Sequence, residues 1–407
     1  MPRAIIIGGS VGGLFAANML RRLGWQVEIH ERAAEGLATR GAGIAGHPEL
    51  EAVMAAAGVE DTRPLGIRIE GRAAIDRHGR TLAYRHRPQQ MTAWTRVFAP
   101  LRQIFPDALY HGGQELVGLE QDAATVTARF ANGRTAEAEL LIGADGFRSS
   151  VRALMAPEVA PRYAGYVAWR GLADETALSA GFRAETFDRF VFALPTGSEF
   201  IGYPVPGRDD SAEPGRRRYN FVWYTPCDEG AELTDLLTDD SGQFHPWSIP
   251  PNRIRAVHLE ALNRRAQALL PTAFAEAVGK SRPYLVQPIY DVESTRIGFG
   301  RVALLGDAAF VARPHLGVGV LKAGQDAEAL AKALAATADV PAALDRYAAE
   351  RIPAGRLAIR YSRWLGSFIE RRLEGPEDDP ALGLTPERIV ESSGRTAEGQ
   401  PPLPPGF

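Results

Sequence analysis

Three short stretches of this sequence combine glycines with acidic residues, and that combination suits the binding of a phosphorylated cofactor. The first stretch is IIIGGSVGGLFAANMLRRLGWQVEIHER, residues 5–32, where an apolar run meets a helical pattern at Gly8, Ser10, Val11 and Gly13. A glycine-rich turn at the start of a helix presents backbone N–H groups and the positive end of the helix dipole to a pyrophosphate. We therefore predict that this turn binds a dinucleotide.

At the end of the first stretch stands Glu31, which follows Gly8 by 31 − 8 = 23 residues. At about 20 residues from the first glycine, a carboxylate is placed to accept hydrogen bonds from ribose hydroxyls. An acid there disfavours a 2′-phosphate, so the site suits FAD or NAD rather than NADP. Arg32 is either an adenine contact or a solvent-facing side chain. Ser10 replaces the middle glycine of G-x-G-x-x-G and is small enough for a close approach.

The second stretch is LLIGADGFRSSVRALM, residues 140–155, in which a strand ends and Asp145 opens a turn into a helix that carries Arg148 and Arg152. Two interpretations remain open for these residues alone. They form either part of a cofactor site or a common Asp-Gly turn.

The third stretch is RVALLGDAAFVARPHLGVGVLKAGQDA, residues 301–327. Gly306 and Asp307 end an apolar strand, at the sheet edge where open α/β sheets bind ligands. There the carboxylate can accept hydrogen bonds from the hydroxyls of a polyol. Gly317 and Gly319 allow the backbone to approach a flat ring. The positive end of the following helix could then stabilise the negative charge of a reduced flavin.

Hydrophobic periodicity predicts the elements that would position these stretches. Residues 3–8 and 26–30 read as strands around a helix at 12–23, a βαβ start, and 300–305 reads as another buried strand. Residues 114–142 read as an antiparallel meander and 163–224 as strand-rich, a platform for a ligand. We predict further helices at 48–57, 92–105, 230–238, 255–280, 318–336 and 341–370.

These elements predict an α/β fold: a Rossmann-like FAD-binding domain of the glutathione-reductase type, an inserted mixed β-sheet substrate domain and a C-terminal helical segment. The tail is rich in Pro, Gly and charge, so we expect an extended, partly disordered arm. The expected boundaries are 1–70, 91–160 and 288–370 for the FAD-binding parts, 71–90 for a substrate-domain excursion, 161–287 for the substrate domain and 371–407 for the arm.

Composition narrows the function classes. The 407 residues carry a formal net charge of −3 with interleaved signs, which gives no sign of a nucleic-acid surface. A single cysteine, Cys227, excludes an internal disulfide and a cysteine-based metal cluster. No apolar run reaches the roughly 18 residues of a membrane span, and the first residues lead directly into a strand. We therefore expect a cytoplasmic enzyme that needs no metal.

In this order, the three stretches resemble those of the FAD-dependent aromatic hydroxylases, the class A flavoprotein monooxygenases. The resemblance extends from residue 1 to about residue 370. It implies that Gly8, Ser10, Val11, Gly13, Glu31 and Arg32 bind the ADP half of FAD, and that Asp145 and Arg152 brace the pyrophosphate region. It also implies that Gly306 and Asp307 bind the ribityl chain, and that the flavin ring is bordered by Gly43, Ile44, Pro314, Leu316, Gly317 and Val318.

Within that family, several strings resemble the branch that hydroxylates dihydroxypyridines: GAGIAGHPEL, YAGYVAWRGL, GYPVPGRD, YNFVWY and ARPHLGVGVLKAGQDA. Two positions depart from the broad family. Ala93 replaces an arginine often found at the start of a helix, and Leu321 replaces an asparagine often found in the flavin helix.

The resemblance implies a reaction in which NADH or NADPH reduces FAD, and O2 then gives a flavin C4a-hydroperoxide that hydroxylates an electron-rich ring, a (di)hydroxypyridine or a similar phenol. His315, His47 and Tyr203 are the candidate catalytic residues, with one histidine acting as base or hydrogen-bond partner to the substrate hydroxyl. Tyr203, Trp169, Arg170 and Tyr224 are the candidate pocket residues; each of them could instead be an ordinary core residue.

Two other functions remain open: an FAD-dependent oxidoreductase without oxygen insertion, such as a reductase, and a flavin-binding protein without turnover. The resemblance favours NADH as reductant and implies a homodimer.

Overall fold

A mostly parallel sheet forms the base of the molecule. The structure is a computed structural model that describes residues 1–34, 37, 43–60, 63–398 and 400–407, so Gly41 and Ala42 of the string GAGIAGHPEL lie outside the described residues. Four pairs of neighbouring strands in this sheet run parallel, and the pair at one edge, the first two strands named below, runs antiparallel. Its strands, in spatial order, are β16 (Gly298–Phe299), β17 (Val302–Leu304), β10 (Leu140–Gly143), β1 (Arg3–Ile7), β2 (Gln26–His30) and β6 (Tyr110–His111).

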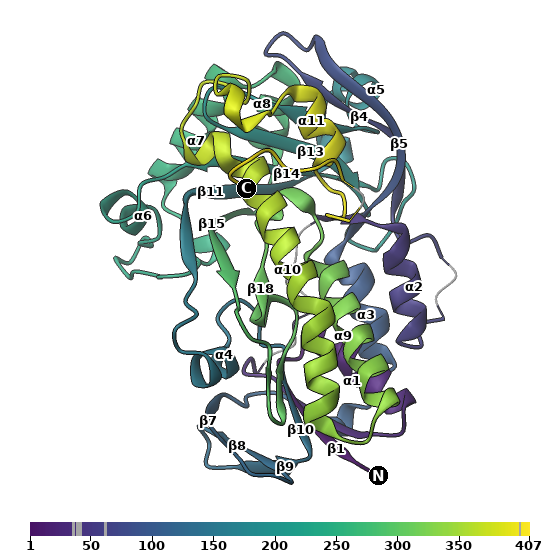
Figure 1. Ribbon diagram of the computed structural model, residues 1–407. Coiled ribbons are helices and arrows are strands. Elements are labelled where there is room, and N and C mark those ends of the chain that lie inside the picture. Colours follow the sequence, from purple (N-terminus) through teal and green to yellow (C-terminus); the bar gives the residue numbers. More distant parts are fainter. Residues whose placement is uncertain (35–36, 38–42, 61–62, 399) are drawn as a thin grey trace.

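Helices and a small antiparallel sheet cover this base. Figure 1 shows α1, α3 and α9 stacked together on the right, with the small sheet at the lower left. Apolar residues of the base, these helices and the small sheet share one core. The helices are α1 (Val11–Arg22), α2 (Pro48–Ala56), α3 (Trp94–Gln103), α9 (Gly319–Ala336) and α10 (Val340–Glu370), and the small sheet is β7 (Leu116–Gln121), β8 (Val126–Phe130) and β9 (Thr135–Ala138).

A second, nine-stranded sheet forms the upper half of the molecule (Figure 1). Its neighbours run antiparallel except for the parallel pair β12 and β4. The order is β18 (Phe310–Val311), β15 (Tyr284–Glu293), β11 (Arg162–Asp174), β14 (Arg218–Pro226), β13 (Glu199–Val205), β12 (Phe190–Ala193), β4 (Ile67–Ile75), β5 (Thr81–Ala93) and β3 (Gly43–Gly46).

The two faces of the nine-stranded sheet have different partners, because successive side chains of a strand point to opposite faces. Trp169, Phe200 and Trp223 pack on one face against the helices α7 (Ala256–Leu269) and α8 (Thr272–Lys280). Tyr203 and Tyr224 lie on the other face, in a core shared with α10 and the C-terminal segment. This second face is the one that turns toward the base.

Some element boundaries differ from the sequence-based expectations. The helix expected at 255–280 is two helices, because Pro271 lacks the N–H group that a continuous helix requires. The helix expected from residue 92 begins at Trp94, after β5 ends. The last strand expected in the meander, β10, instead joins the parallel base. Residues 67–70 already belong to β4, and β15 crosses the expected boundary at residue 287.

The C-terminal segment differs from the expected extended, partly disordered arm. Its described residues contain the helix α11 (Pro386–Ser392) and a short turn at Pro380–Leu382. Leu382, Leu384, Ile389 and Val390 are buried in the core beneath the nine-stranded sheet. These apolar side chains give the segment the burial that an unattached tail lacks.

Shorter helices complete the described elements. They are α4 (Ser150–Met155), α5 (Ala180–Glu185), α6 (Ala231–Leu236) and single 3-10 turns at Asp107–Leu109, Glu175–Ala177, Pro251–Arg253, Gly306–Ala308 and Pro314–Leu316. None of the described helices combines the length and the apolar character that crossing a bilayer requires.

Candidate functional site

Two cavities meet between the parallel base and the nine-stranded sheet. The first has a volume of about 430 Å³ and lies at the carboxyl ends of the base strands. The second has a volume of about 420 Å³ and lies under the nine-stranded sheet. Asp307, Gly319 and Val320 line both cavities. A single elongated ligand can therefore extend from one cavity into the other.

The first cavity collects most of the residues expected to bind ADP. These are Gly8, Ser10, Val11, Glu31 and Arg32, joined by Asp145, Gly306 and Asp307 from the other two stretches. Ser10 is the N-cap of α1 without using its side chain as a cap, so its hydroxyl is not committed to the helix end.

Glu31 fixes the shape of the phosphate-binding turn as well as lining the first cavity. Its carboxylate accepts hydrogen bonds from the backbone N–H groups of Gly9, at 2.8 Å, and Ala33, at 2.9 Å. The acid therefore ties the turn before α1 to the end of β2. The same carboxylate has further lone pairs for ribose hydroxyls.

Gly13 does not line the first cavity and acts through packing. A Cβ atom on Gly13 would lie 1.9 Å from the carbonyl oxygen of Gly8, so any larger residue would push α1 away from the turn. Gly8 itself has a φ of +107°, a conformation that favours glycine. Both glycines therefore hold the strand, the turn and the helix close together.

The second stretch stabilises its own turn after β10 and is hydrogen-bonded to the third stretch. The Asp145 carboxylate accepts hydrogen bonds from Ser149 Oγ, at 2.5 Å, and from the N–H of Ser150, at 2.7 Å, while its residue lines the first cavity. Arg152 is buried and does not line either cavity; its guanidinium donates to the Ala308 carbonyl at 2.9 Å. Arg152 therefore positions the third stretch rather than a ligand.

A buried charged network holds the Gly306 peptide in place. Asp326 accepts a hydrogen bond from the Gly306 N–H at 3.0 Å, and Lys322 Nζ donates to the Gly306 carbonyl at 2.8 Å. Arg351 donates to the other Asp326 oxygen at 2.7 Å. Gly306 has a φ of +63°, so this peptide turns where a side chain would be strained.

Asp307 faces the cavities at the point where they meet. Its side chain is exposed there, yet the surrounding protein desolvates the carboxylate and raises its pKa, while Lys322 and Arg152 oppose the shift. Hydrogen bonds from the hydroxyl groups of a ligand would stabilise the charged form of a carboxylate in this position.

Aromatic and backbone surfaces form the second cavity. Of the expected ring and pocket residues, it is lined by Gly43, Ile44, Pro314, His315, Gly317, Val318, Tyr203, Tyr224 and Arg170. Gly317 has a φ of +63°, and the backbone from Pro314 to Gly319 forms one wall without a bulky side chain at its glycines. A flat ring can lie against such a wall.

Arg170 brings a positive charge into this cavity. Within the described part of the chain it has no hydrogen-bond or ion-pair partner, and its Nε is buried without an acceptor. Arg170 lies close enough to the phenols of Tyr203 and Tyr224 to influence the pKa of both. Burial raises the pKa of Tyr203 to about 12 and raises that of Tyr224 well above its ordinary value, and Arg170 opposes both shifts.

His315 lies at the wall of the second cavity with both ring nitrogens engaged. Its Nδ1 is 2.7 Å from Glu199 Oε2, and its Nε2 is 2.8 Å from the Tyr166 hydroxyl. His315 and Glu199 are each 1% exposed. The ring also contacts Tyr224, with centroids 4.3 Å apart. His315 therefore positions the aromatic wall and has no free nitrogen for a ligand in this arrangement.

Besides Gly13 and Arg152, three expected site residues lie outside the cavities. Trp169 points to the opposite face from Arg170 and packs with Trp223, because adjacent residues of a strand cannot face the same side. Leu316 is fully buried in the core beneath the nine-stranded sheet. His47 is buried at the N-cap of α2, where its Nε2 lies 3.1 Å from the Gly317 carbonyl and its pKa is lowered by burial.

Sequence reasoning missed the partners of these residues: Glu199, Tyr166, Lys322 and Asp326. The Lys322–Asp326 pair carries a visible signal, since a lysine and an aspartate four residues apart share one face of a helix. Glu199 is separated from His315 by 116 residues, and no local pattern links the two.

The cavities together fit FAD. The first offers a helix N-terminus, glycines and the Glu31 acid to a nucleotide. Asp307 offers a carboxylate to a polyol at the junction, and the second cavity offers a flat backbone wall to a ring. The chemistry of the lining groups therefore suits the successive parts of FAD.

Comparison with known proteins agrees with this geometry. A family model described as FAD binding domain matches residues 2–162 and 255–362, and one described as FAD binding domain-like matches residues 163–291. The chain is 31% identical over 392 residues to 2,6-dihydroxypyridine 3-monooxygenase of Paenarthrobacter nicotinovorans, which covers 96% of this chain and 97% of that protein.

Solved structures are similar across both sheets. The structure of 2,6-dihydroxypyridine-3-hydroxylase from Arthrobacter nicotinovorans superposes with a TM-score of 0.86 at 31% identity and covers 94% of this chain and 96% of that one. Klebsiella pneumoniae HpxO complexed with FAD and uric acid has a TM-score of 0.75 at 25% identity, covering 97% of this chain and 94% of that one.

Proposed function

Because the chain belongs to the family of FAD-dependent aromatic monooxygenases, we propose that it hydroxylates a small hydroxylated ring, with a (di)hydroxypyridine as the substrate class. FAD is its cofactor, and O2 and a reduced nicotinamide are its co-substrates. When bound, FAD transfers electrons from the nicotinamide to dioxygen and makes one oxygen atom available to the ring. The residues around it must bind the ring, orient it and exclude water.

The observation that carries the substrate class is the Arg170 guanidinium in an aromatic cavity. A cation without a protein partner stabilises a negative charge brought by a ligand. A ring hydroxyl ionises more readily beside it, and an ionised hydroxyl enriches the ring carbons ortho and para to it in electrons. Arg170 therefore orients the ring and favours the form that accepts an electrophilic oxygen.

Tyr203 and Tyr224 complete the recognition of the ring. Because burial raises the pKa of both phenols, they remain protonated near neutral pH and act as hydrogen-bond donors. Two donors and one cation on one cavity wall suit a ring with more than one oxygen substituent. A dihydroxypyridine has that pattern, as the name of the relative from Paenarthrobacter nicotinovorans suggests.

The contacts of His315 support a positioning role. Its link to Glu199 and Tyr166 fixes the ring behind Tyr224. His47 makes a similar contribution at the Gly317 carbonyl. A direct proton transfer from substrate to either histidine remains a prediction from the resemblance.

The decisive experiment measures product mass under ¹⁸O2. The purified FAD-loaded protein is incubated with NADH and a panel of dihydroxypyridines, hydroxynicotinates and hydroxybenzoates. We expect a dihydroxypyridine to gain one labelled oxygen in proportion to the NADH oxidised, with NADPH less effective. Hydroxylation of benzenoid rings alone would contradict the pyridine assignment. Oxidation of NADH without labelled product from any ring would contradict oxygen insertion itself.

The oligomeric state is a separate proposal: that the protein forms a homodimer. Light scattering of the FAD-loaded protein across a tenfold concentration range tests it, and a constant mass equal to one chain would contradict it.

A further inference from the structure

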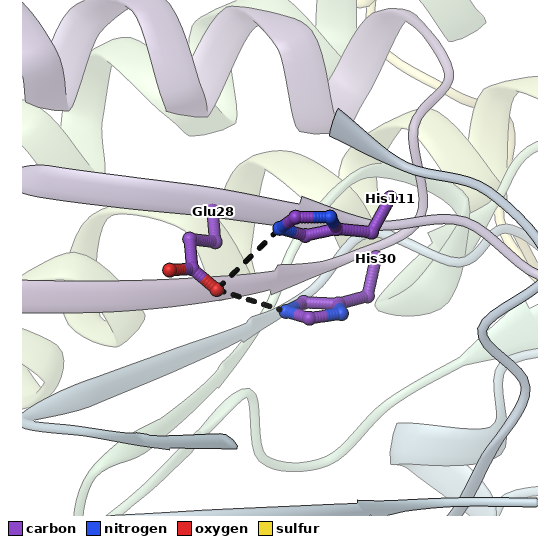
Figure 2. Close-up of side chains that lie close together, drawn as sticks. All are labelled: Glu28, His30 and His111. Atoms are coloured by element: carbon purple, nitrogen blue, oxygen red, sulfur yellow. Dashed lines mark ion pairs between the residues drawn. The ribbon is translucent and has the colours of Figure 1, made fainter. Parts of the chain in front are cut away.

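A second group of chemically active side chains borders the first cavity, which His30 helps to line. Glu28 and His30 come from β2 and His111 from β6 (Figure 2). His30 and His111 are register partners in neighbouring parallel strands, and Glu28 precedes His30 by two residues, so all three share one face of the sheet. Figure 2 shows both imidazole rings directed toward the same Glu28 carboxylate oxygen.

The spacing of the three side chains suits a common ligand. Glu28 Oε2 lies 3.5 Å from His30 Nε2 and 3.7 Å from His111 Nε2. One ligand atom from each residue lies within 4.8 Å of the other two. Ligand atoms around a tetrahedral Zn²⁺ are separated by about 3.3–3.4 Å, given Zn–N and Zn–O lengths of about 2.0–2.1 Å. The third edge, between the two imidazole nitrogens, lies within 4.8 Å, and His111, which is partly exposed, has room to adjust to an ion.

His30 lacks the partners that a buried imidazole normally has. Its side chain is 2% exposed, and neither Nδ1 nor Nε2 has a hydrogen-bond partner among the described residues. The ring stacks on Phe130 at 4.5 Å and lies 5.0 Å from His111. A buried imidazole whose nitrogens have no hydrogen-bond partner has an unused lone pair.

We propose that Glu28, His30 and His111 bind one transition-metal ion of the Zn²⁺ class. Two neutral imidazoles and a carboxylate are a known ligand set for this ion, with water in the fourth position. Glu28 is 49% exposed, which provides the entry path. Arg134 opposes the ion electrostatically, and the Glu28 carboxylate offsets part of that repulsion.

The site adjoins the acid that lines the first cavity. The backbone N–H of Glu31 donates to the carbonyl of His111 at 2.8 Å. An ion held by His30 and His111 fixes the pair β2 and β6 next to Glu31. Any effect of the metal on FAD affinity is then matched by an equal effect of FAD on metal affinity, since linkage between two sites is reciprocal.

Metal binding is measured on the untagged, FAD-loaded protein after dialysis against EDTA. Calorimetric titration with ZnCl2 and elemental analysis after gel filtration give affinity and stoichiometry. We expect one Zn²⁺ per chain and a loss of affinity of about a hundredfold in His111→Ala and in Glu28→Gln, because each removes one of three ligands. His111 is partly exposed, so its truncation should leave the fold intact, which FAD content and circular dichroism verify.

A matched control comes from another histidine–carboxylate pair, His245 and Asp239, whose Nε2 and Oδ2 lie 2.9 Å apart. His245→Ala should bind Zn²⁺ as the wild type does. Three results overturn the proposal: no Zn²⁺ retained by the wild type, equal affinity in the wild type and both ligand variants, or loss of binding in His245→Ala alone. None of these results depends on which ring the protein hydroxylates.

Discussion

We expect a single side chain, Arg170, to determine most of the ligand specificity of the second cavity. Arg170→Met keeps a similar length and removes the charge, so an anionic ring should bind about 10- to 100-fold more weakly, the range expected for losing a hydrogen bond to a charged group. The affinity of Arg170→Lys for the anionic ring should lie between those of Arg170→Met and the wild type. Lysine keeps the positive charge and loses the planar, two-pronged hydrogen-bonding geometry of the guanidinium. Perturbation of the flavin spectrum by the ligand measures both affinities.

The control for Arg170 is a ring without an ionisable group, whose affinity should change little in either variant. FAD content should also stay at the wild-type level, since Arg170 lies among the pocket aromatics. Equal affinity of Arg170→Met and the wild type for the anionic ring would remove the basis for the proposed substrate class.

Asp307 provides a prediction with a defined pH dependence. Desolvation by the surrounding protein raises the pKa of Asp307 in the folded apo-protein above its value in the unfolded chain. The stability that its protonated form contributes is present below the unfolded-state pKa and is lost as the pH rises through the folded-state pKa. Asp307→Asn stays neutral, so the apo variant should be more stable than the apo wild type at pH 8, and this difference should shrink toward pH 4.

The same substitution should weaken FAD binding about tenfold or more, because it replaces a charged acceptor of hydroxyl hydrogen bonds by a neutral one. Urea unfolding of the apo forms and fluorescence titration with FAD provide the two measurements. An apo variant less stable than the wild type at pH 8 would show that Asp307 is stabilised by the protein rather than strained in it.

At the scale of elements, the C-terminal segment closes the second cavity. Gly394 lines that cavity, and its N–H donates to the His315 carbonyl at 2.8 Å. Arg72 is fully buried beneath the segment and donates to the Gly394 carbonyl at 2.9 Å. The segment is therefore part of the site even though it follows the last helix of the base.

Truncation after Gly375 should destabilise the protein by several kcal/mol, because it removes Leu382, Leu384, Ile389 and Val390 from the core, each worth about 1.5–3 kcal/mol when buried. Coupling of NADH oxidation to hydroxylation should also fall, since water can enter the cavity. Truncation after Gly394 keeps those four side chains and serves as the control, with a smaller loss of stability in urea. Equal stability of the two truncations would contradict this role.

Local patterns predicted the parts of the fold that depend on short sequence distances. The fold class is confirmed, and the first strand, turn and helix occur within one residue of the expected bounds. The sequence also allows side-chain direction to be predicted along a strand. Because successive residues point to opposite faces, Arg170 and Trp169 cannot both face the cavity. The tail was misjudged because its apolar residues are spread among prolines and charges, and their burial depends on a surface built by distant strands.

The buried network of His315 shows where sequence reasoning stops. Glu199 and Tyr166 come from two different strands, 116 and 149 residues from His315. Their meeting depends on how the third stretch docks under the nine-stranded sheet. Chain separation of this size leaves no periodicity to detect, so such partners emerge only from the assembled fold.

At the scale of the whole molecule, the two cavities proposed to bind the cofactor belong to halves built on different sheets. The first cavity belongs to the parallel base and the second to the nine-stranded sheet, with Asp307 at their junction. A ligand that occupies both cavities stabilises the folded state by mass action, by about 2.7 kcal/mol at a concentration 100 times its Kd. One ligand therefore contributes to the stability of both halves at once.

ADP and riboflavin each resemble one half of that ligand, and this allows the two cavities to be tested separately. We expect ADP alone and riboflavin alone to raise the thermal midpoint of the apo-protein slightly, and the two added together to raise it less than FAD does. Covalent linkage makes the second contact intramolecular, so FAD gains from an effective concentration that the free halves lack. Glu31→Gln should reduce the shift with ADP and leave the shift with riboflavin unchanged. If riboflavin alone matched FAD, the first cavity would contribute nothing to binding, and the assignment of the Gly8–Glu31 region to the nucleotide would fail.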